Sequence, residues 1–265
     1  MSALFESAGV NVLGHQQTVV KLSANARAML EQVGSANVAT VLLKRGFRNT
    51  YLLGLNALSG NQERLVGPAY TLRFIPARED LDSMSNYGRD DNLHRRAIEE
   101  CPPGYVLVIA TGGCIRSASA GDIMAARLRQ RHVAGMVTDG GFRDSQDIRA
   151  TGLPAYQKQS APPATPIALH PVELDGPVDC AGVAIYPGDV LVGDGEGVAV
   201  IPSYLVDEVA VEAFAALEYE AFVNMHISQG RSIMGLFPAT PESRIEYEAW
   251  VRDGRHSVHA LKEAR

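Results

Sequence analysis

Two short segments of the chain place glycine beside charged side chains in an order that suits metal and carboxylate chemistry. Gly121 and Asp122 open the segment GDIMAA, and Arg143 and Asp144 close the segment DGGFRD. An arginine grips an oxyanion through its guanidinium group, while two carboxylates hold a hard divalent cation through oxygen and water. We therefore expect these four residues to form a site for an anionic substrate and a divalent metal ion.

Neither segment is a strong signal by itself. A glycine before an amphipathic helix is most often ordinary capping, and an arginine beside an aspartate is most often a solvated pair. The glycine loop nevertheless exposes unpaired backbone N–H groups at the positive end of a helix dipole, which suits a carboxylate. The combination favours a site, because Asp122 and Asp144 are expected at adjacent strand ends, where α/β folds place their ligands.

The elements that would position these segments follow a repeated rhythm between Pro102 and Gln157. Apolar runs predict strands in PPGYVLVIA, AGMVTD and LPAYQ, and TGGCIRSASAGD reads as a loop of small residues. Helical periodicity marks DIMAARLRQRH, and residues 145–150 form a shorter, polar, helix-like stretch. This alternation of strand, loop and helix predicts the α/β class.

Helical segments are expected on both sides of this core. Apolar residues recur at helical spacing over residues 21–45, which predicts two helices with Ser35 available to cap the second. Residues 65–74 predict a strand that is interrupted at Gly67 and Pro68 and followed by a polar surface loop.

Beyond the core, short strands joined by turns are expected over residues 177–202, with GDGEG as a tight hairpin rather than a phosphate loop. An apolar face predicts a long helix over 203–229, and the charged tail 241–265 is expected to pack on a neighbouring subunit. The expected organisation is an N-terminal helical segment (1–60), an α/β core (61–202) and a C-terminal helix with an oligomerisation arm (203–265), together one structural domain.

Composition restricts the partners and the compartment. The 265 residues are 46% hydrophobic, enough for one substantial core, and the net charge of -6 argues against nucleic acid, which recruits clustered lysine and arginine. Three widely spaced cysteines fit reduced thiols in a cytoplasm. Residues 1–17 lack the pattern of an export signal, and no apolar run is long enough for a membrane span, so we expect a cytoplasmic protein without a membrane partner.

Three stretches of the chain resemble the RraA-like family, which includes 4-hydroxy-4-methyl-2-oxoglutarate/4-carboxy-4-hydroxy-2-oxoadipate aldolases. The stretches are PPGYVLVIATGG, GDIMAARLRQRHVAGMVTDGGFRDSQDIRATGLPAY and YPGDVLVGDGEGVAVIP. The resemblance implies a β-β-α layered, swivelling-domain-like fold that assembles as a trimer or hexamer with active sites between subunits. It also implies a metal-dependent lyase that cleaves a 4-hydroxy-2-oxo acid to pyruvate and a second oxo acid, with oxaloacetate decarboxylation as a side activity.

The same resemblance implies catalytic and metal-binding roles for charged residues. Arg143 and Asp144 match the arginine and aspartate that bind substrate and a Mg²⁺ or Mn²⁺ ion. Asp122 matches the acidic residue that supports metal-bound water. A glutamate from a neighbouring subunit's C-terminal helix is matched best by Glu220 and next by Glu218, although a glutamate on a long polar-faced helix is as often simply solvated.

Further residues are expected to bind the substrate. The family binds the substrate carboxylate through the glycine loop, which matches Gly121 and the amides of Ile123, Met124 and Ala125. Arg116, in the preceding loop, is a candidate contact for a second substrate carboxylate.

Three different interpretations of the same residues stay open. A Schiff-base lysine could serve as the electron sink, and Lys158 is the only lysine placed just beyond a strand of the core. A non-catalytic regulator is the second, because the family takes its name from proteins that inhibit a ribonuclease by protein contact. Another metal-assisted reaction, such as hydrolysis or dehydration of a sugar-derived 2-oxo acid, is the third. His94 and His132 are interpreted as structural rather than acid–base residues.

Overall fold

A computed structural model describes residues 22–58 and 64–254 of the chain. The absence of an export signal was inferred from residues 1–17, which lie outside the described residues, as do residues 255–265 of the charged tail. All three cysteines are described and free, as expected from their spacing. No helix within the described ranges combines the length and apolarity needed to cross a bilayer.

A mixed sheet forms the centre of the molecule, with the strand order β1-β7-β5-β3-β2-β12-β13 and with β9 also paired to β2. Pairing is parallel among β2, β3, β5 and β7, and antiparallel for β1, β9, β12 and β13. The strands are β1 (Asn56–Ala57), β2 (Leu65–Pro76), β3 (Val106–Ala110), β5 (Gly135–Thr138), β7 (Ala155–Gln157), β9 (Leu169–Leu174), β12 (Val190–Gly193) and β13 (Val198–Ile201).

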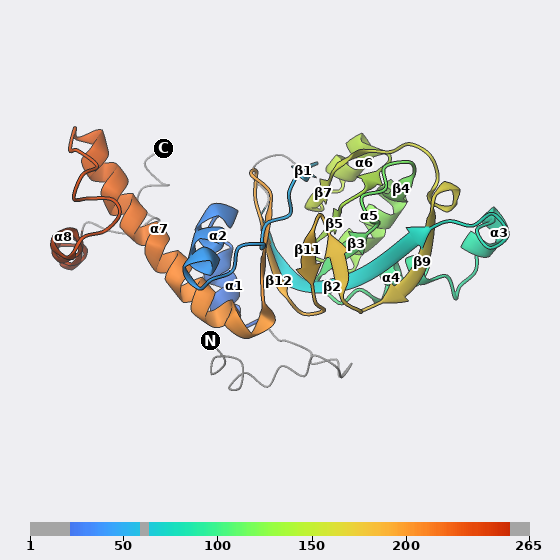
Figure 1. Cartoon of the computed structure of the whole chain (residues 1–265), viewed down its shortest axis with the longest axis horizontal. Helices are drawn as coiled ribbons and strands as arrows, with labels where there is room; N and C mark the ends of the chain where they lie inside the picture. The colour runs from blue at the N-terminus through green and yellow to red at the C-terminus, as the bar shows by residue number, and fades with distance from the viewer. Residues whose placement is uncertain (1–21, 59–63, 255–265) are drawn as a thin grey trace.

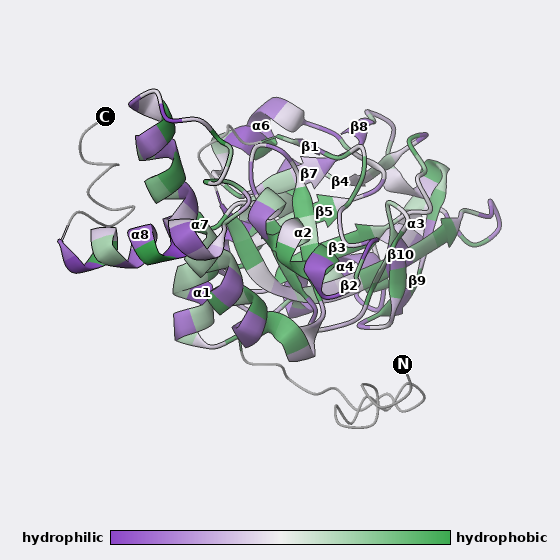
Figure 2. Ribbon diagram, turned by 60° about the vertical axis from the view of Figure 1, so that its left-hand side comes forward, coloured by the Kyte–Doolittle hydropathy of each residue, from purple (hydrophilic) through white to green (hydrophobic). Residues whose placement is uncertain are grey.

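The sheet is covered on both faces, which explains why its central strands are hydrophobic throughout (Figure 2). Leu107 and Ile109 of β3 face the core beneath helices α4 (Leu93–Glu100), α5 (Asp122–Gln130) and α6 (Ser145–Ala150). Val106 and Val108 face the hairpin of β10 (Val178–Cys180) and β11 (Val183–Ile185). Alternate side chains of β3 therefore pack into two hydrophobic cores, one on each face of the sheet. The expected α/β class is confirmed.

The N- and C-terminal helices form a separate layer on β12 and β13. Helices α1 (Ala24–Leu30) and α2 (Ser35–Lys44) pack with the first half of α7 (Val206–Ser228), as the helical periodicity predicted. The second half of α7 extends away from the sheet and carries α8 (Pro241–Arg252) at its far end (Figure 1).

Three local predictions from the sequence were wrong. Residues 65–76 form one uninterrupted strand, in which the missing side chain of Gly67 lets the carbonyl of Gly104 approach closely. The segment after this strand contains a short helix, α3 (Met84–Tyr87), whose first turn is capped by the Ser83 hydroxyl. The small-residue loop contains a strand, β4 (Ala118–Ala120).

The cap of α2 also differs from the prediction. Gly34 occupies the N-cap position and Ser35 is the first helical residue. The carboxylate of Asp194, from the β12–β13 hairpin, accepts hydrogen bonds from the Ser35 amide at 2.8 Å and the Ser35 hydroxyl at 2.9 Å. It also accepts the Glu196 amide at 3.0 Å and pairs with Arg64 at 3.2 Å. The GDGEG hairpin therefore caps a helix that is about 160 residues away in sequence.

Asp194→Ala should reduce the stability of the protein without changing its fold. The substitution leaves the Ser35 amide unsatisfied and removes the contact between the hairpin and the helix, so we expect a loss of about 1–3 kcal/mol in the free energy of unfolding. Urea titration followed by circular dichroism measures this loss. Asp147→Ala, at an exposed position on α6, is the control and should change the value by less than about 0.5 kcal/mol. Equal stability of the two variants would contradict the capping role.

Candidate functional site

A second, small parallel sheet brings the two glycine segments together. Its strands are β4, β6 (Gly141–Phe142) and β8 (Gln159–Ser160), paired in the order β4-β6-β8. The amide of Arg143 donates a hydrogen bond to the carbonyl of Ala120 at 3.1 Å. Gly121 and Arg143 therefore follow the ends of adjacent parallel strands, which is the juxtaposition expected from the sequence.

Gly121 provides the surface on which the charged pair rests. A Cβ atom at this position would lie 3.0 Å from Oδ2 of Asp144 and 3.1 Å from Nε of Arg143. Nε and Oδ2 are themselves 3.2 Å apart, and both side chains remain partly exposed. Asp144 adopts a left-handed backbone conformation with φ 56° and ψ 41°, an arrangement that aspartate tolerates better than most residues. We name Gly121, Asp122, Arg143 and Asp144 the Arg143 corner.

The start of α5 supplies free amides to this corner, but not all of those that were expected. The amide of Ala125 donates to the carbonyl of Gly121 at 3.0 Å, because it closes the first turn of the helix. Ala125 is therefore unavailable to a ligand through its amide, and its assignment as a substrate-binding residue was wrong. The amides of Asp122, Ile123 and Met124 precede the first helical hydrogen bond and are the donors that remain.

A buried carboxylate that was not assigned a role from the sequence shapes the loop beside the corner. Asp139 accepts hydrogen bonds from the Thr111 amide at 2.7 Å, the Thr111 hydroxyl at 2.8 Å and the Gly113 amide at 2.8 Å. Its side chain follows β5, and the loop follows β3, the adjacent parallel strand. Asp139 therefore connects the ends of two core strands. In the sequence, the one signal for this role is that Asp139 directly follows an apolar strand.

Two further cations lie on the loops near the corner. The Nζ atom of Lys158 lies 3.6 Å from the point where a Cβ atom on Gly113 would stand, and the Lys158 amide donates to the carbonyl of Gly140. Arg116 is exposed on the loop before β4. Both are placed where they could meet an anion, and the structure shows neither in contact with the Arg143–Asp144 pair.

Tyr87 approaches the corner from the segment that was expected to be only a surface loop. Its hydroxyl lies 3.4 Å from Nδ1 of His94. Burial raises the pKa of Tyr87, and this effect is opposed by the Thr165 side chain and by the positive charge of Arg143. His94 is fully buried, and burial lowers its pKa to about 4, although the Ser119 backbone acts in the opposite direction. His94 is therefore neutral near pH 7 and serves as a structural support, as predicted.

The two candidate glutamates lie far from the corner within one chain. Glu220 is on α7 and accepts a hydrogen bond from the Asn37 side chain of α2 at 2.9 Å. Burial and the negative charge of Glu218 both raise the pKa of Tyr247, a residue of α8. Glu218 therefore lies near α8. Figure 1 shows α7 on the opposite side of the sheet from α5 and α6. A single chain therefore does not bring Glu220 to Arg143.

The carboxylates of the corner fit a divalent cation that keeps most of its coordination sites for water and substrate. Asp144 is partly exposed, and Asp122 stands in the first turn of α5. Among the described residues, no group of three or more histidine, cysteine, aspartate or glutamate side chains forms a complete cage. Mg²⁺ is commonly held by one or two carboxylates with water and substrate oxygens, which is the donor set that this corner offers.

Gly121→Ala tests the contact between the glycine and the charged pair. The backbone of Gly121 has φ -139°, which alanine adopts without strain, so the added methyl group acts only by displacing Arg143 and Asp144. We expect the affinity for Mn²⁺, measured from the EPR signal of the free ion, to fall by about 10-fold or more while the fold is retained. Gly88→Ala is the control, because its nearest contacts would be an ordinary 3.6 Å. Unchanged Mn²⁺ affinity in Gly121→Ala would exclude this contact as a determinant of the site.

Comparison with known proteins identifies the family of the chain. A family model for RraA-like proteins, described as Aldolase/RraA, matches residues 23–200. The chain is 34% identical over 145 residues to a protein of Halalkalibacterium halodurans named "Putative 4-hydroxy-4-methyl-2-oxoglutarate aldolase", covering 53% of this chain and 60% of that protein. It is 26% identical over 182 residues to Protein DlpA of Legionella pneumophila, covering 69% of this chain and 28% of DlpA. The chain thus spans less than two thirds of both proteins.

Two solved structures share the fold. RraAS2 of Streptomyces coelicolor, described as an unusual member of the RNase ES inhibitor RraA protein family, superposes with a TM-score of 0.67 and 33% identity, covering 77% of this chain and 97% of that one. An uncharacterized protein from Pseudomonas syringae gives a TM-score of 0.72 at 24% identity, covering 85% of this chain and 95% of that one. The fold and the match over residues 23–200 show that the chain belongs to the RraA-like family.

Proposed function

We propose that the protein is a divalent-metal-dependent carbon–carbon lyase that cleaves a 4-hydroxy-2-oxo acid to pyruvate and a second oxo acid, with oxaloacetate decarboxylation as a side activity. The observation that carries the proposal is the close contact of the Arg143 and Asp144 side chains with Gly121, next to the unpaired amides at the start of α5. Similarity to a relative named as an aldolase supports it.

Each residue of the corner has a role in this reaction. The amides of Asp122, Ile123 and Met124 bind the carboxylate beside the 2-oxo group, helped by the positive end of the α5 dipole. Arg143 binds the oxygen on the fourth carbon through its guanidinium. Asp144 would hold Mg²⁺ or Mn²⁺, with Asp122 beside it as the base, and this cation, when bound, stabilises the enolate charge as a Lewis acid.

The bonding changes follow from these roles. The hydroxyl group on the fourth carbon loses its proton toward Asp122, and the bond between the third and fourth carbons breaks to give the second oxo acid and the enolate of pyruvate. The proton taken up by Asp122 is then returned, directly or through water, to the third carbon and gives pyruvate. Decarboxylation of oxaloacetate leaves the same enolate and needs no base. One site therefore serves both reactions, and the electrostatic requirement common to them is stabilisation of the enolate.

The first test measures pyruvate release from oxaloacetate and from 4-hydroxy-4-methyl-2-oxoglutarate with coupled lactate dehydrogenase. We expect release in the presence of Mg²⁺ or Mn²⁺, loss with a chelator, and a decrease of about 10²–10³-fold in kcat/KM in Arg143→Ala and in Asp144→Ala. Arg149→Ala is the control, because Arg149 lies on the same α6 segment and bonds to the carbonyl of Leu58 instead. Chelator-resistant release that is sensitive to borohydride and lost in Lys158→Ala would instead indicate Schiff-base catalysis.

A protein-binding role is the non-catalytic function to weigh against the lyase, because RraAS2 is described as a member of a family of RNase ES inhibitors. The free amides and the exposed Arg143–Asp144 pair favour a small anionic ligand over such a role. Release of pyruvate from neither substrate, together with intact Mn²⁺ binding, would favour a metal-assisted reaction on a different oxo acid. Release from neither substrate without Mn²⁺ binding would favour the protein-binding role.

We further propose that the site is completed by a second copy of the chain, in a trimer or hexamer, through Glu220. The far half of α7 leaves the sheet (Figure 1), and Glu220, which bonds to Asn37 of α2 within its own chain, would reach the corner of a neighbouring copy only by exchanging this contact. Glu220 would support the base at Asp122, and the oxaloacetate reaction would depend on it less.

Mixing two inactive variants tests this arrangement. We expect Arg143→Ala and Glu220→Ala each to lose aldol cleavage, and a mixture of the two, unfolded and refolded together, to recover roughly a quarter of the wild-type activity through random pairing of intact half-sites. Glu218→Ala is the control and should remain active alone. If Glu220→Ala alone keeps full activity, Glu220 is not part of the site. If both single variants are inactive and their mixture stays inactive, sharing of the site is refuted.

A further inference from the structure

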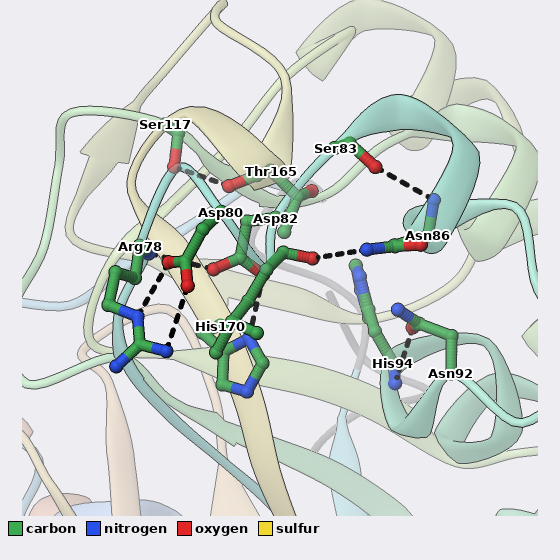
Figure 3. A network of polar contacts seen from close by, with 11 residues as sticks. Arg78, Asp80, Asp82, Ser83, Asn86, Asn92, His94, Ser117, Thr165 and His170 are labelled. Atoms are coloured by element: carbon green, nitrogen blue, oxygen red, sulfur yellow. Dashed lines mark hydrogen bonds and ion pairs between the residues drawn. The ribbon is translucent and has the colours of Figure 1, made fainter.

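A cleft outside the Arg143 corner opens between the α3 segment and the strand β9. It has a volume of about 320 Å³, and its lining includes Ser83, Asn86, Tyr87, Asn92, Leu169 and His170. Figure 3 shows polar residues converging here from the α3 segment, the start of α4 and β9. The lining is mixed, with leucine and proline side chains between hydroxyl, amide and imidazole groups. Such a surface suits a short aliphatic chain that carries hydroxyl groups.

Tyr87 forms the wall between this cleft and the corner. Its ring lines the cleft, and its hydroxyl lies 3.4 Å from His94. The rings of Tyr87 and His94 pack with centroids 5.8 Å apart, and the buried His94 lies against the backbone of β4 at Ser119. The next residue of β4, Ala120, accepts the hydrogen bond from the Arg143 amide. His94, against which Tyr87 packs, and Arg143 therefore meet β4 at consecutive residues, and the positive charge of Arg143 acts to lower the pKa of Tyr87, so the cleft wall at Tyr87 lies near the corner.

The charges around the cleft are already paired with one another. Arg89, the only arginine of the lining, donates two hydrogen bonds to Asp91 at 2.8 Å and 2.7 Å. His170 lies 2.7 Å from Asp82, which also accepts the Arg78 amide. The lining thus contains two aspartates, one arginine and one histidine, and each of the two basic side chains is paired with an aspartate. The lining therefore offers no unpaired cation. A carboxylate that entered the cleft would lose hydration without gaining a partner, whereas a hydroxyl group would not meet this penalty.

We propose that this cleft receives the substituent on the fourth carbon of the substrate and selects an uncharged, hydroxyl-bearing chain over one that ends in a carboxylate. The inference rests on the proposed function, because it assigns the fourth carbon to Arg143. It narrows the substrate class to 4-hydroxy-2-oxo acids whose second oxo-acid product carries a neutral polar chain.

Three substrates that differ only at this substituent test the selection. They are 2-oxo-4-hydroxyglutarates that carry a methyl, a hydroxymethyl or a carboxymethyl group on the fourth carbon, and oxaloacetate, which has no such substituent, serves as the reference. We expect kcat/KM for the hydroxymethyl compound to exceed that for the carboxymethyl compound by about 10-fold or more, with the methyl compound between them.

A charge change in the cleft should reverse part of this preference. Asp91→Asn releases Arg89 from its partner without altering the size of the side chain, so kcat/KM for the carboxymethyl compound should rise by about 3–10-fold. The rate with oxaloacetate should stay unchanged. Asp80→Asn is a matched control, because Asp80 forms the same kind of pair with Arg78 in the same segment but does not line the cleft.

The outcomes separate the two proposals. Turnover of oxaloacetate together with equal rates for the hydroxymethyl and carboxymethyl compounds would overturn the assignment of the cleft and leave the lyase proposal standing. An equal response of Asp91→Asn and Asp80→Asn would also overturn it, because the effect would then reflect general charge. Absence of turnover with every compound, oxaloacetate included, would overturn the proposed function and the assignment that rests on it.

Discussion

The Asp139 carboxylate is the interaction on which the geometry of the site depends. It stands at the end of β5 and satisfies two amides and one hydroxyl group of the loop that follows β3. A buried carboxylate is tolerated only where hydrogen bonds replace its hydration, and these three donors do so. The loop in turn packs against Gly140, where any side chain would collide with the carbonyl of Cys114 and with Thr111. The path of the chain into Arg143 is thereby fixed before any ligand binds.

Close approach between backbones is the second constraint, and it acts through glycine. Gly121 lets the charged pair lie against the start of α5, and Gly141 lets β6 lie against the backbone of Gln159 and Ala161. These contacts hold three very short strands in register, although each contributes few hydrogen bonds of its own. Short strands are weak by themselves, so the surrounding core must position them. The core does this through Phe142 and Ala120, which are buried against the sheet.

Features that depend on local pattern could be predicted from the sequence, whereas features that depend on distant contacts could not. Helical periodicity identified α6 and the long α7, and the adjacency of Gly121 and Arg143 followed from strand ends. The cap of α2 could not be predicted, because its acceptor, Asp194, comes from a hairpin far along the chain. Tyr87 was missed for the same reason, since its polar surroundings indicated a loop and its partners lie on other elements.

The position of Ala125 shows a different limit. The sequence located the start of the helix at Asp122, as observed, but Ala125 is the fourth helical residue and its amide makes the first helical hydrogen bond, to the carbonyl of Gly121. The direction of Arg143 is set instead by the strand before it.

The left-handed backbone of Asp144 has a consequence for how this position varies among related sequences. Glycine, asparagine and aspartate adopt φ 56° at less cost than most residues, so folding alone disfavours many substitutions there. Among these three, aspartate is the one that carries a negative charge. Invariance at this position would thus reflect both the backbone conformation and the charge, and an asparagine in a relative would keep the conformation while removing the proposed metal ligand. Under the proposed metal role of Asp144, an alignment at this position would separate relatives that keep the metal ligand from relatives that keep only the fold.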